Sequence, residues 1–445
     1  MLTLQFGQCG NQLGRVLFSK LSEDIDYCTS TGVSYDVNYQ YINDSVNKWF
    51  GRVTKNNRHL AKAILVDTEE KVINQLCYNF ENSWAYCSKN IVCEAGSGSA
   101  NNWAYGHLVK GQQLSDLVMN CVRLEIEQMD QLDGFLSLLS CAGGTGSGIG
   151  SYILDVLREE YRKKTIIAAT VLPFSSGEVC LQNYNSLLTL SKFNGNVDTV
   201  LIFENSKIYE ICKNLVKTDN TSVQDMNNII AKKLISILQP VNDSSFNLNI
   251  LSSRLSPHVS YKFATIKSIP YVTDDALKFN SVCSWESYVK YLKQMLHVPY
   301  SSIERADSKI KLPLLKTSKN TIANYNYYSC VANILITRGR SSKNDLLITD
   351  DLTDNNLFTN WTMNDRFTHF HQTRNIFKCE KFLSLITNNS YISKPLEEIL
   401  QKAWTLYTHS AFLHQYKQFG LEEQDFLEAF AKIENIINNY KKLTN

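Results

Sequence analysis

The sequence predicts an α/β fold with a parallel sheet, and three segments support this prediction. The apolar run 135–139 is typical of a buried strand, and it is followed by a glycine-rich turn and then by apolar residues at helical spacing. The apolar runs 63–66 and 166–172 are equally short, and they end at Asp67 and Pro173. Doubly wound sheets bind ligands at the carboxyl ends of their strands. The residues that follow these runs are therefore the first candidates for a binding site.

Length and composition limit the class of protein. A chain of 445 residues suggests two or three domains with sizeable cores. Lys and Arg number 45 against 43 Asp and Glu, so the net charge of +2 gives no electrostatic reason to expect nucleic acid or membrane as a partner. The 12 cysteines form no C-x-x-C pair, which argues against a zinc site or a disulfide scaffold and favours a reducing cytoplasm. We expect no secretory signal and no membrane span.

The glycine-rich turn is the strongest single signal. Between 134 and 150 a strand pattern leads into G-G-T-G-S-G and then into a helix, a geometry that brings backbone N–H groups and the helix N-terminus close to an anion. The turn is not a Walker A loop, because Gly148 is followed by Ile149 rather than by Lys. It also lacks the G-x-G-x-x-G spacing of dinucleotide-binding proteins. Without a lysine, phosphate charge must be met by N–H groups, hydroxyls and a metal; a flexible glycine turn is the alternative interpretation.

Two other strand ends carry polar residues. An opening strand with Leu2, Leu4 and Phe6 runs directly into the segment 7–12. The run 63–66 is followed by two carboxylates, which suit water-mediated Mg²⁺ coordination beside phosphates. In isolation, that acidic segment would be better explained as a solvated turn.

A long helix is expected after residue 222. Ser222 and Asp225 have the spacing of a capping box, apolar residues follow at helical spacing to Leu238, and Pro240 ends the pattern. Apolar stripes at 396–407, including Trp404, and at 426–440 predict two more amphipathic helices, and ordinary core packing explains their periodicity.

Several separated motifs resemble one protein family. The GGTGSG turn after a strand, FGQCGNQLG at 6–14 and SANNWAYGH at 99–107 are similar to the tubulins. Within that family, the segments that most resemble delta-tubulin are 66–75, 175–193 and 403–426.

This resemblance implies the tubulin fold and its ligands. It implies a Rossmann-like GTP-binding domain at 1–220, a core helix at 221–241, an α+β intermediate domain at 242–365 and a C-terminal helical region at 366–445. The expected ligand is GTP or GDP with Mg²⁺.

The resemblance also assigns roles to individual residues. Asp67 and Glu69 would hold Mg²⁺ through water, Glu178 and Gln182 would lie near the ribose, and Asn205 would read the guanine edge. The full set of expected nucleotide-binding residues is Gln8, Cys9, Gln12, Asp67, Glu69, Asn101, Ser140, Gly143, Gly144, Thr145, Gly146, Ser147, Gly148, Glu178, Gln182, Asn205, Val223 and Asn227.

The sequence departs from the family pattern at three positions near the expected site. Ala100 stands before Asn101 where tubulins usually have glycine, and Gln182 stands where glutamate is common. Val223 stands where many relatives have an aromatic residue that stacks on the base, so base stacking is expected to be weaker.

The expected function is that of a GTP-binding structural protein, delta-tubulin-like, in centriole or basal-body triplet microtubules and in cilia and flagella. Its expected partners are other tubulins or centriolar proteins. The alternative is a polymerising tubulin that turns over GTP in the lattice. Against it, Ile250 occupies the expected place of the acid that activates water in a stacked neighbour, and no acidic side chain follows Glu434. We therefore expect at most a slow, partner-dependent GTPase and assign no catalytic residue. A Rossmann-type oxidoreductase is excluded by the missing dinucleotide fingerprint.

Overall fold

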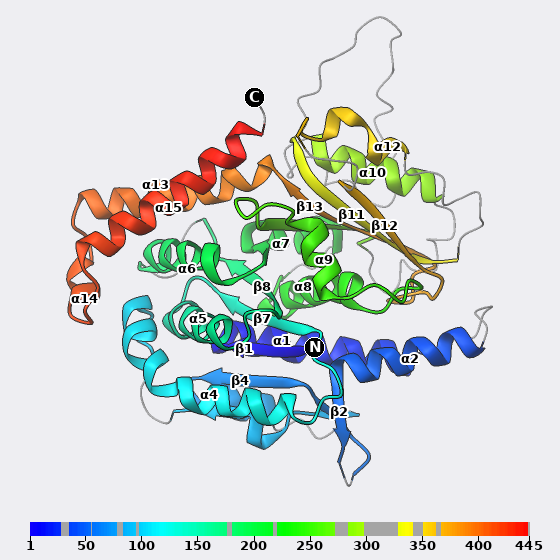
Figure 1. Ribbon diagram of the computed structural model, residues 1–445, viewed down its shortest axis with the longest axis horizontal. Coiled ribbons are helices and arrows are strands. Elements are labelled where there is room, and N and C mark those ends of the chain that lie inside the picture. Colours follow the sequence, from blue (N-terminus) through cyan, green and yellow to red (C-terminus); the bar gives the residue numbers. More distant parts are fainter. Residues whose placement is uncertain are drawn as a thin grey trace, which may run out of the picture.

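A computed structural model describes residues 1–27, 35–54, 56–77, 83–94, 98–175, 180–216, 220–271, 284–297, 328–340, 350–361 and 366–443. The centre of the molecule is a ten-stranded sheet in the order β12-β11-β13-β10-β9-β8-β7-β1-β4-β6 (Figure 1). Its strands are β1 (Leu2–Phe6), β4 (Ala63–Asp67), β6 (Ile91–Cys93), β7 (Gly134–Ser140), β8 (Thr165–Leu172), β9 (Thr199–Glu204), β10 (Phe263–Ile269), β11 (Cys330–Gly339), β12 (Phe367–Gln372) and β13 (Lys381–Asn389).

The part of this sheet from β6 to β10 is parallel throughout. β13 pairs antiparallel with both β10 and β11, and β12 pairs parallel with β11. A separate three-stranded sheet contains β2 (Phe50–Val53), β3 (His59–Ala61) and β5 (Trp84–Ala85). The α/β class predicted from the sequence is confirmed.

Helices cover both faces of the sheet. Their bounds are α1 (Gly7–Asp26), α2 (Tyr35–Trp49), α3 (Glu70–Cys77), α4 (Gly111–Ile126), α5 (Gly150–Glu160), α6 (Gln182–Asn196), α7 (Asn205–Ile211), α8 (Val223–Leu238), α9 (Leu248–Leu255), α10 (Trp285–His297), α12 (Asp350–Thr353), α13 (Ser393–Thr408), α14 (Leu413–Lys417) and α15 (Glu423–Lys442). The segments 105–110, 145–149 and 212–216 are π-helical.

Alternation along the buried strands separates two cores. In β4, Ile64 and Val66 belong to the core that also contains residues of α4, α5 and α6, whereas Ala63 and Leu65 belong to the core that contains residues of α1, α8 and α9. Successive side chains of a strand point to opposite faces, so a strand buried on both sides is apolar throughout. The helices on each face of the sheet are therefore held in place relative to the ends of its strands.

Helix α8 begins and ends where the sequence predicts. Ser222 Oγ accepts a hydrogen bond from the Asp225 backbone N–H at 3.2 Å, and Asp225 Oδ2 accepts one from the Ser222 N–H at 2.9 Å, which completes the capping box. At the other end, the buried guanidinium of Arg338 on β11 donates to the carbonyl oxygens of Ser236, Gln239 and Pro240 at 2.6–2.8 Å. A cation satisfies the free carbonyls at a helix C-terminus.

The two predicted C-terminal helices are α13 and α15, which lie side by side on the outer surface (Figure 1). The stripe of α15 is buried as expected, from Phe426 to Tyr440. The prediction was wrong for Trp404 of α13, which is 47% exposed and contacts Tyr407 and Phe430 at the edge of the pair. Among the described residues, no helix has the length and apolar character needed to cross a bilayer.

Candidate nucleotide-binding site

A cavity of about 320 Å³ lies at the carboxyl ends of β1, β4, β7, β8 and β9, closed on one side by the start of α8. This volume is within the range of small-molecule sites. Of the residues predicted from the sequence, the following line the cavity: Gln8, Cys9, Gln12, Asp67, Glu69, Asn101, Ser140, Gly143, Gly144, Thr145, Gly146, Gln182, Asn205, Val223 and Asn227. Glu178 lies outside the described residues.

Two predicted residues at the end of the glycine turn, Ser147 and Gly148, do not line the cavity. Ser147 is buried and its hydroxyl donates to the Gly143 carbonyl. A Cβ on Gly148 would lie 2.6 Å from the Trp103 carbonyl oxygen, so this glycine allows two backbone segments to touch. In the structure, both residues shape the turn.

Two glycines of the site have different structural requirements. Gly7 has φ +68° and a Cβ there would lie 2.9 Å from the Gly146 nitrogen, so the end of β1 and the glycine turn require glycine to approach so closely. In contrast, a Cβ on Gly143 would meet only Asn101 Oδ1, at 3.7 Å, and the cavity beside it is open. Gly143 therefore presents its bare backbone to whatever occupies the cavity.

The carboxylate side of the cavity is built around Asp67. Its Oδ1 accepts hydrogen bonds from the backbone N–H groups of Thr68 and Glu69 at 2.8 and 3.3 Å, and its Oδ2 accepts one from Asn11 at 3.1 Å. Burial nevertheless raises the pKa of Asp67 to about 6. Within the described residues no cluster of three or more His, Cys, Asp or Glu could hold a metal alone. Asp67 and Glu69 fit a Mg²⁺ ion that takes its other ligands from phosphates and water.

Three hydroxyls connect the loops beside the glycine turn. Thr145 Oγ1 lies 2.9 Å from Thr68 Oγ1 and 2.8 Å from Ser99 Oγ, and these last two lie 3.3 Å apart. Sequence reasoning missed Thr68 and Ser99, although Thr68 stands between the two predicted carboxylates.

The loop before α4 has an unusual backbone. Ala100 and Asn101 have φ +49° and +52°, which is the left-handed region. Nδ2 of the buried Asn185 holds the loop by donating to the carbonyls of Asn101 and Ala142 at 2.7 and 2.8 Å. Glycine at position 100 would adopt this conformation without strain.

The far end of the cavity offers amide groups and an apolar wall. Asn205 is the first residue of α7, and Asn227 and Met226 lie in the first turns of α8. Val223 is 58% exposed, so it provides a small apolar contact at the rim. Gln182 is buried and its Nε2 donates to the Phe174 carbonyl at 3.1 Å. Burial raises the pKa of Cys9 to about 11, so its thiol is neutral.

Comparison with known proteins bears on the occupant of this cavity. The sequence model of the Tubulin/FtsZ family GTPase domain matches residues 1–213. The tubulin delta chain of Mus musculus is 35% identical over 100% of this chain and 99% of its own length. The delta chain of Homo sapiens is 34% identical over the full length of both proteins. The chain belongs to the tubulin family. The gamma chain of Saccharomyces cerevisiae is 30% identical over 62% of this chain and 58% of its own length, and the beta-1 chain of Hypocrea rufa is 25% identical over 99% of this chain and 94% of its own.

Membership of the tubulin family supports a guanine nucleotide as the ligand of the cavity. The matched GTPase domain contains the ends of β1, β4, β7, β8 and β9 and the glycine turn.

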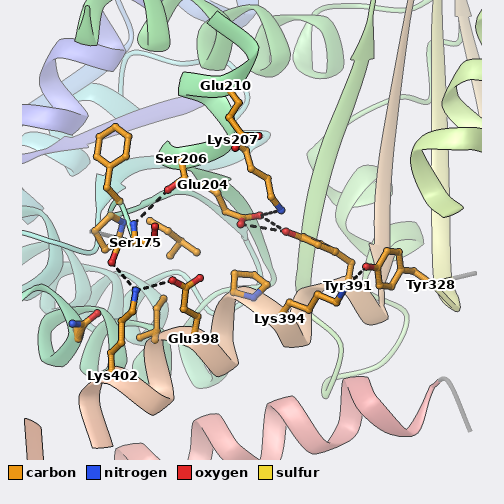
Figure 2. A pocket seen from close by; sticks show the side chains of 16 residues that line it. Ser175, Glu204, Ser206, Lys207, Glu210, Tyr328, Tyr391, Lys394, Glu398 and Lys402 are labelled. Atoms are coloured by element: carbon orange, nitrogen blue, oxygen red, sulfur yellow. Dashed lines mark hydrogen bonds and ion pairs between the residues drawn. The ribbon is translucent and has the colours of Figure 1, made fainter. Parts of the chain in front are cut away.

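A second cavity of about 340 Å³ adjoins this first cavity and shares Pro173 and Phe174 with it. Figure 2 shows Lys402 of α13 reaching the Ser175 carbonyl and Glu398, each at 2.6 Å. Lys207 pairs with Glu204 at 2.9 Å and lies over the Tyr391 ring. The cations of this cavity are thus engaged by neighbouring side chains, and the glycine turn is not among its lining residues. We assign the nucleotide to the first cavity.

Proposed function

We propose that this tubulin is a GTP-binding structural subunit of a microtubule-type assembly. The observation that carries the proposal is the convergence of the glycine turn, the Asp67–Glu69 carboxylates and the Asn205–Asn227 amides on one cavity. Backbone N–H groups with Mg²⁺ suit a polyphosphate, and two amides suit the mixed donor and acceptor edge of guanine.

Each wall of the cavity has a proposed role toward GTP. The segment 143–146 would contact the phosphates, and Asp67 and Glu69 would hold Mg²⁺ through water. Asn101 would approach the terminal phosphate. Gln182, whose amide donates to the Phe174 carbonyl, would offer its oxygen to the ribose. Asn205 and Asn227 would read the base, with Val223 beside it.

We propose that the chain does not activate hydrolysis in a stacked neighbour. Ile250, in the first turn of α9, is half-buried against the core and carries no acid. Asp243, the one carboxylate in 242–257, accepts hydrogen bonds from the Ser245 N–H and hydroxyl at 2.9 and 2.7 Å. Any hydrolysis of this chain's own GTP would therefore depend on a partner that caps its cavity.

The cellular part of the proposal follows from the similarity to delta chains. We propose a role in triplet microtubules of centrioles or basal bodies and in cilia or flagella, with other tubulins or centriolar proteins as partners. A fluorescent fusion of the full chain would test this location. Signal that is spread through the cytoplasm and absent from centrioles would contradict it.

The nucleotide assignment is tested by acid release and chromatography of the ligand on purified, undenatured protein. We expect guanine nucleotide, mostly GTP that persists for hours. Gly143→Ala should lose the nucleotide while remaining folded, since its methyl group would enter the cavity and meet no backbone atom within 4 Å. Gly144 is unsuitable, because a Cβ there would lie 2.5 Å from the Ser99 carbonyl oxygen.

Gly195→Ala is the matched control, because a Cβ there meets nothing within 4 Å and the residue lies at the end of α6, outside the cavity. It should keep the nucleotide. A wild-type chain that carries no guanine nucleotide and binds none when it is added would overturn the proposed function. Equal nucleotide content in both alanine variants would place the ligand elsewhere.

A further inference from the structure

The hydroxyls of Thr68, Ser99 and Thr145, beside the glycine turn, are not equivalent. Thr145 lines the cavity, whereas Thr68 and Ser99 are buried, with 1% and 4% of their surface exposed. Both short contacts, 2.8 and 2.9 Å, involve Thr145 Oγ1. The contact that omits Thr145, between Thr68 and Ser99, is 3.3 Å long. Hydroxyl–hydroxyl bonds are usually 2.5–3.0 Å, so Thr145 is the centre of this cluster.

The number of protons decides what Thr145 can offer a ligand. Each hydroxyl has one proton and two lone pairs. Thr145 Oγ1 can accept from both Thr68 and Ser99, which uses both of its lone pairs and both of their protons. In that arrangement the proton of Thr145 is the one not used inside the cluster. Because Thr145 borders the cavity, that proton is available to an acceptor there.

We infer that Thr68 and Ser99 are positioning residues for nucleotide binding: by donating to Thr145 Oγ1 they direct its proton into the cavity, toward a phosphate oxygen. This inference rests on the proposed function. A hydroxyl that accepts two hydrogen bonds is also a stronger donor, because linked hydrogen bonds polarise one another.

The arrangement compensates for a feature of the glycine turn. The turn has no lysine to meet phosphate charge, so its hydroxyl and N–H donors carry more of the binding. Thr68 follows β4, Ser99 precedes the loop of Ala100 and Asn101, and Thr145 starts the π-helical turn that continues into α5. The cluster therefore aligns a donor from one loop with two supports from two others.

The test measures the dissociation constant for GTP with Mg²⁺ on the nucleotide-free full chain, in a double-mutant cycle. Thr145→Val should weaken binding about tenfold, the effect of losing one hydrogen bond to a charged group. Thr68→Val with Ser99→Ala should weaken it about fivefold, although neither residue lines the cavity. Combined with Thr145→Val, the same two substitutions should add less than about twofold, because the donor they orient is absent.

Two further variants separate orientation from general destabilisation. Thr68→Ser keeps the hydroxyl and should bind GTP with the affinity of wild type. Thr3→Val removes a buried hydroxyl that has no hydrogen-bond partner among the described residues, and should leave affinity unchanged. If the Thr68 and Ser99 substitutions weaken binding equally with and without Thr145, or not at all, the inference is overturned while the proposed function stands. If wild type binds no GTP, the proposed function itself fails and the inference fails with it.

Discussion

Nδ2 of Asn11 lies 3.1 Å from Oδ2 of Asp67, and this hydrogen bond joins the first turns of α1 to the end of β4. Asn11 is fully buried, and the same Nδ2 also approaches the Val66 carbonyl at 3.3 Å. Its Oδ1 is buried and has no partner within the described residues. The carboxylate of Asp67 is thus held by one amide and two backbone N–H groups, yet burial outweighs them and raises its pKa to about 6.

This pKa predicts a pH-dependent stability for the nucleotide-free protein. The folded pKa of Asp67 is above the ordinary value of 3.8, so the folded state binds its proton more tightly than the unfolded state does. Its stabilising contribution is complete below about pH 4 and is lost as the pH rises through about 6. Asp67→Asn should therefore raise the free energy of unfolding by about 1–2 kcal/mol at pH 7.5 and by little at pH 4. Asn11 can turn its unpaired Oδ1 toward the new amide.

Urea unfolding of the nucleotide-free protein at several pH values measures this effect. Glu70→Gln is the control, because Glu70 is an exposed carboxylate in the first turn of α3. It should show no comparable gain at pH 7.5. A gain for Asp67→Asn that is the same at pH 4 and pH 7.5 would contradict the role assigned to the buried carboxylate.

Ala100→Gly should stabilise the chain. A left-handed φ costs a residue with a Cβ about 1–2 kcal/mol. The substitution removes this cost, but roughly 0.5–1 kcal/mol of the gain is offset because glycine has greater freedom in the unfolded chain. We expect the free energy of unfolding to rise by about 0.5–1 kcal/mol, measured by denaturant titration. Asn57→Gly is the matched control, with φ +58° in an exposed turn. Asparagine tolerates this region better, so its gain should be smaller; equal gains would argue against strain at Ala100.

Asn205→Asp should reduce the preference for guanine over adenine nucleotides. The amide can donate to guanine O6 and accept from its N–H groups, whereas a carboxylate only accepts. The ratio of the dissociation constant for ATP to that for GTP should fall about tenfold, the effect of one lost hydrogen bond near a buried polar group. Competition binding with both nucleotides measures it. An unchanged ratio would remove Asn205 from base recognition.

The parts of the fold that depend on local pattern could be predicted from the sequence. Short apolar runs located β4, β7 and β8, and Ser222 with Asp225 located the start of α8, because strand burial and capping act over a few residues. Since parallel strands deliver their carboxyl ends to one edge, the loops that meet at the cavity also followed from these patterns.

The features of the site that could not be predicted depend on contacts between loops that lie far apart in the sequence. Thr68 and Thr145 are 77 positions apart and Asn185 holds a carbonyl 84 positions away, so no local pattern reveals either contact. Ser147 and Gly148 belong to the glycine motif, but the Ser147 hydroxyl bonds back to the Gly143 carbonyl and Gly148 packs on the Trp103 backbone, so neither lines the cavity. The helical period of α13 likewise cannot show that Trp404 lies at the outer edge of the α13–α15 pair.

Lys402→Met should speed the release of nucleotide from a distance. Lys402 Nζ, on α13, lies 2.6 Å from the Ser175 carbonyl, and the neighbouring Phe174 lines both cavities (Figure 2). Methionine keeps much of the apolar stem but removes this hydrogen bond, so the wall formed by Phe174 loses its link to α13. Because Lys402 is about one-third exposed (36% of its side chain), the effect should be modest, about two- to fivefold in the dissociation rate.

A chase with unlabelled GTP after loading with a fluorescent analogue measures that rate. The matched control is Lys441→Met, which removes a 2.7 Å ion pair between α15 and Glu397 of α13 without touching either cavity. Its dissociation rate should equal that of wild type. If both variants release nucleotide equally fast, the C-terminal helices influence the site through general stability, and the contact between Lys402 and Ser175 does not couple them to the nucleotide.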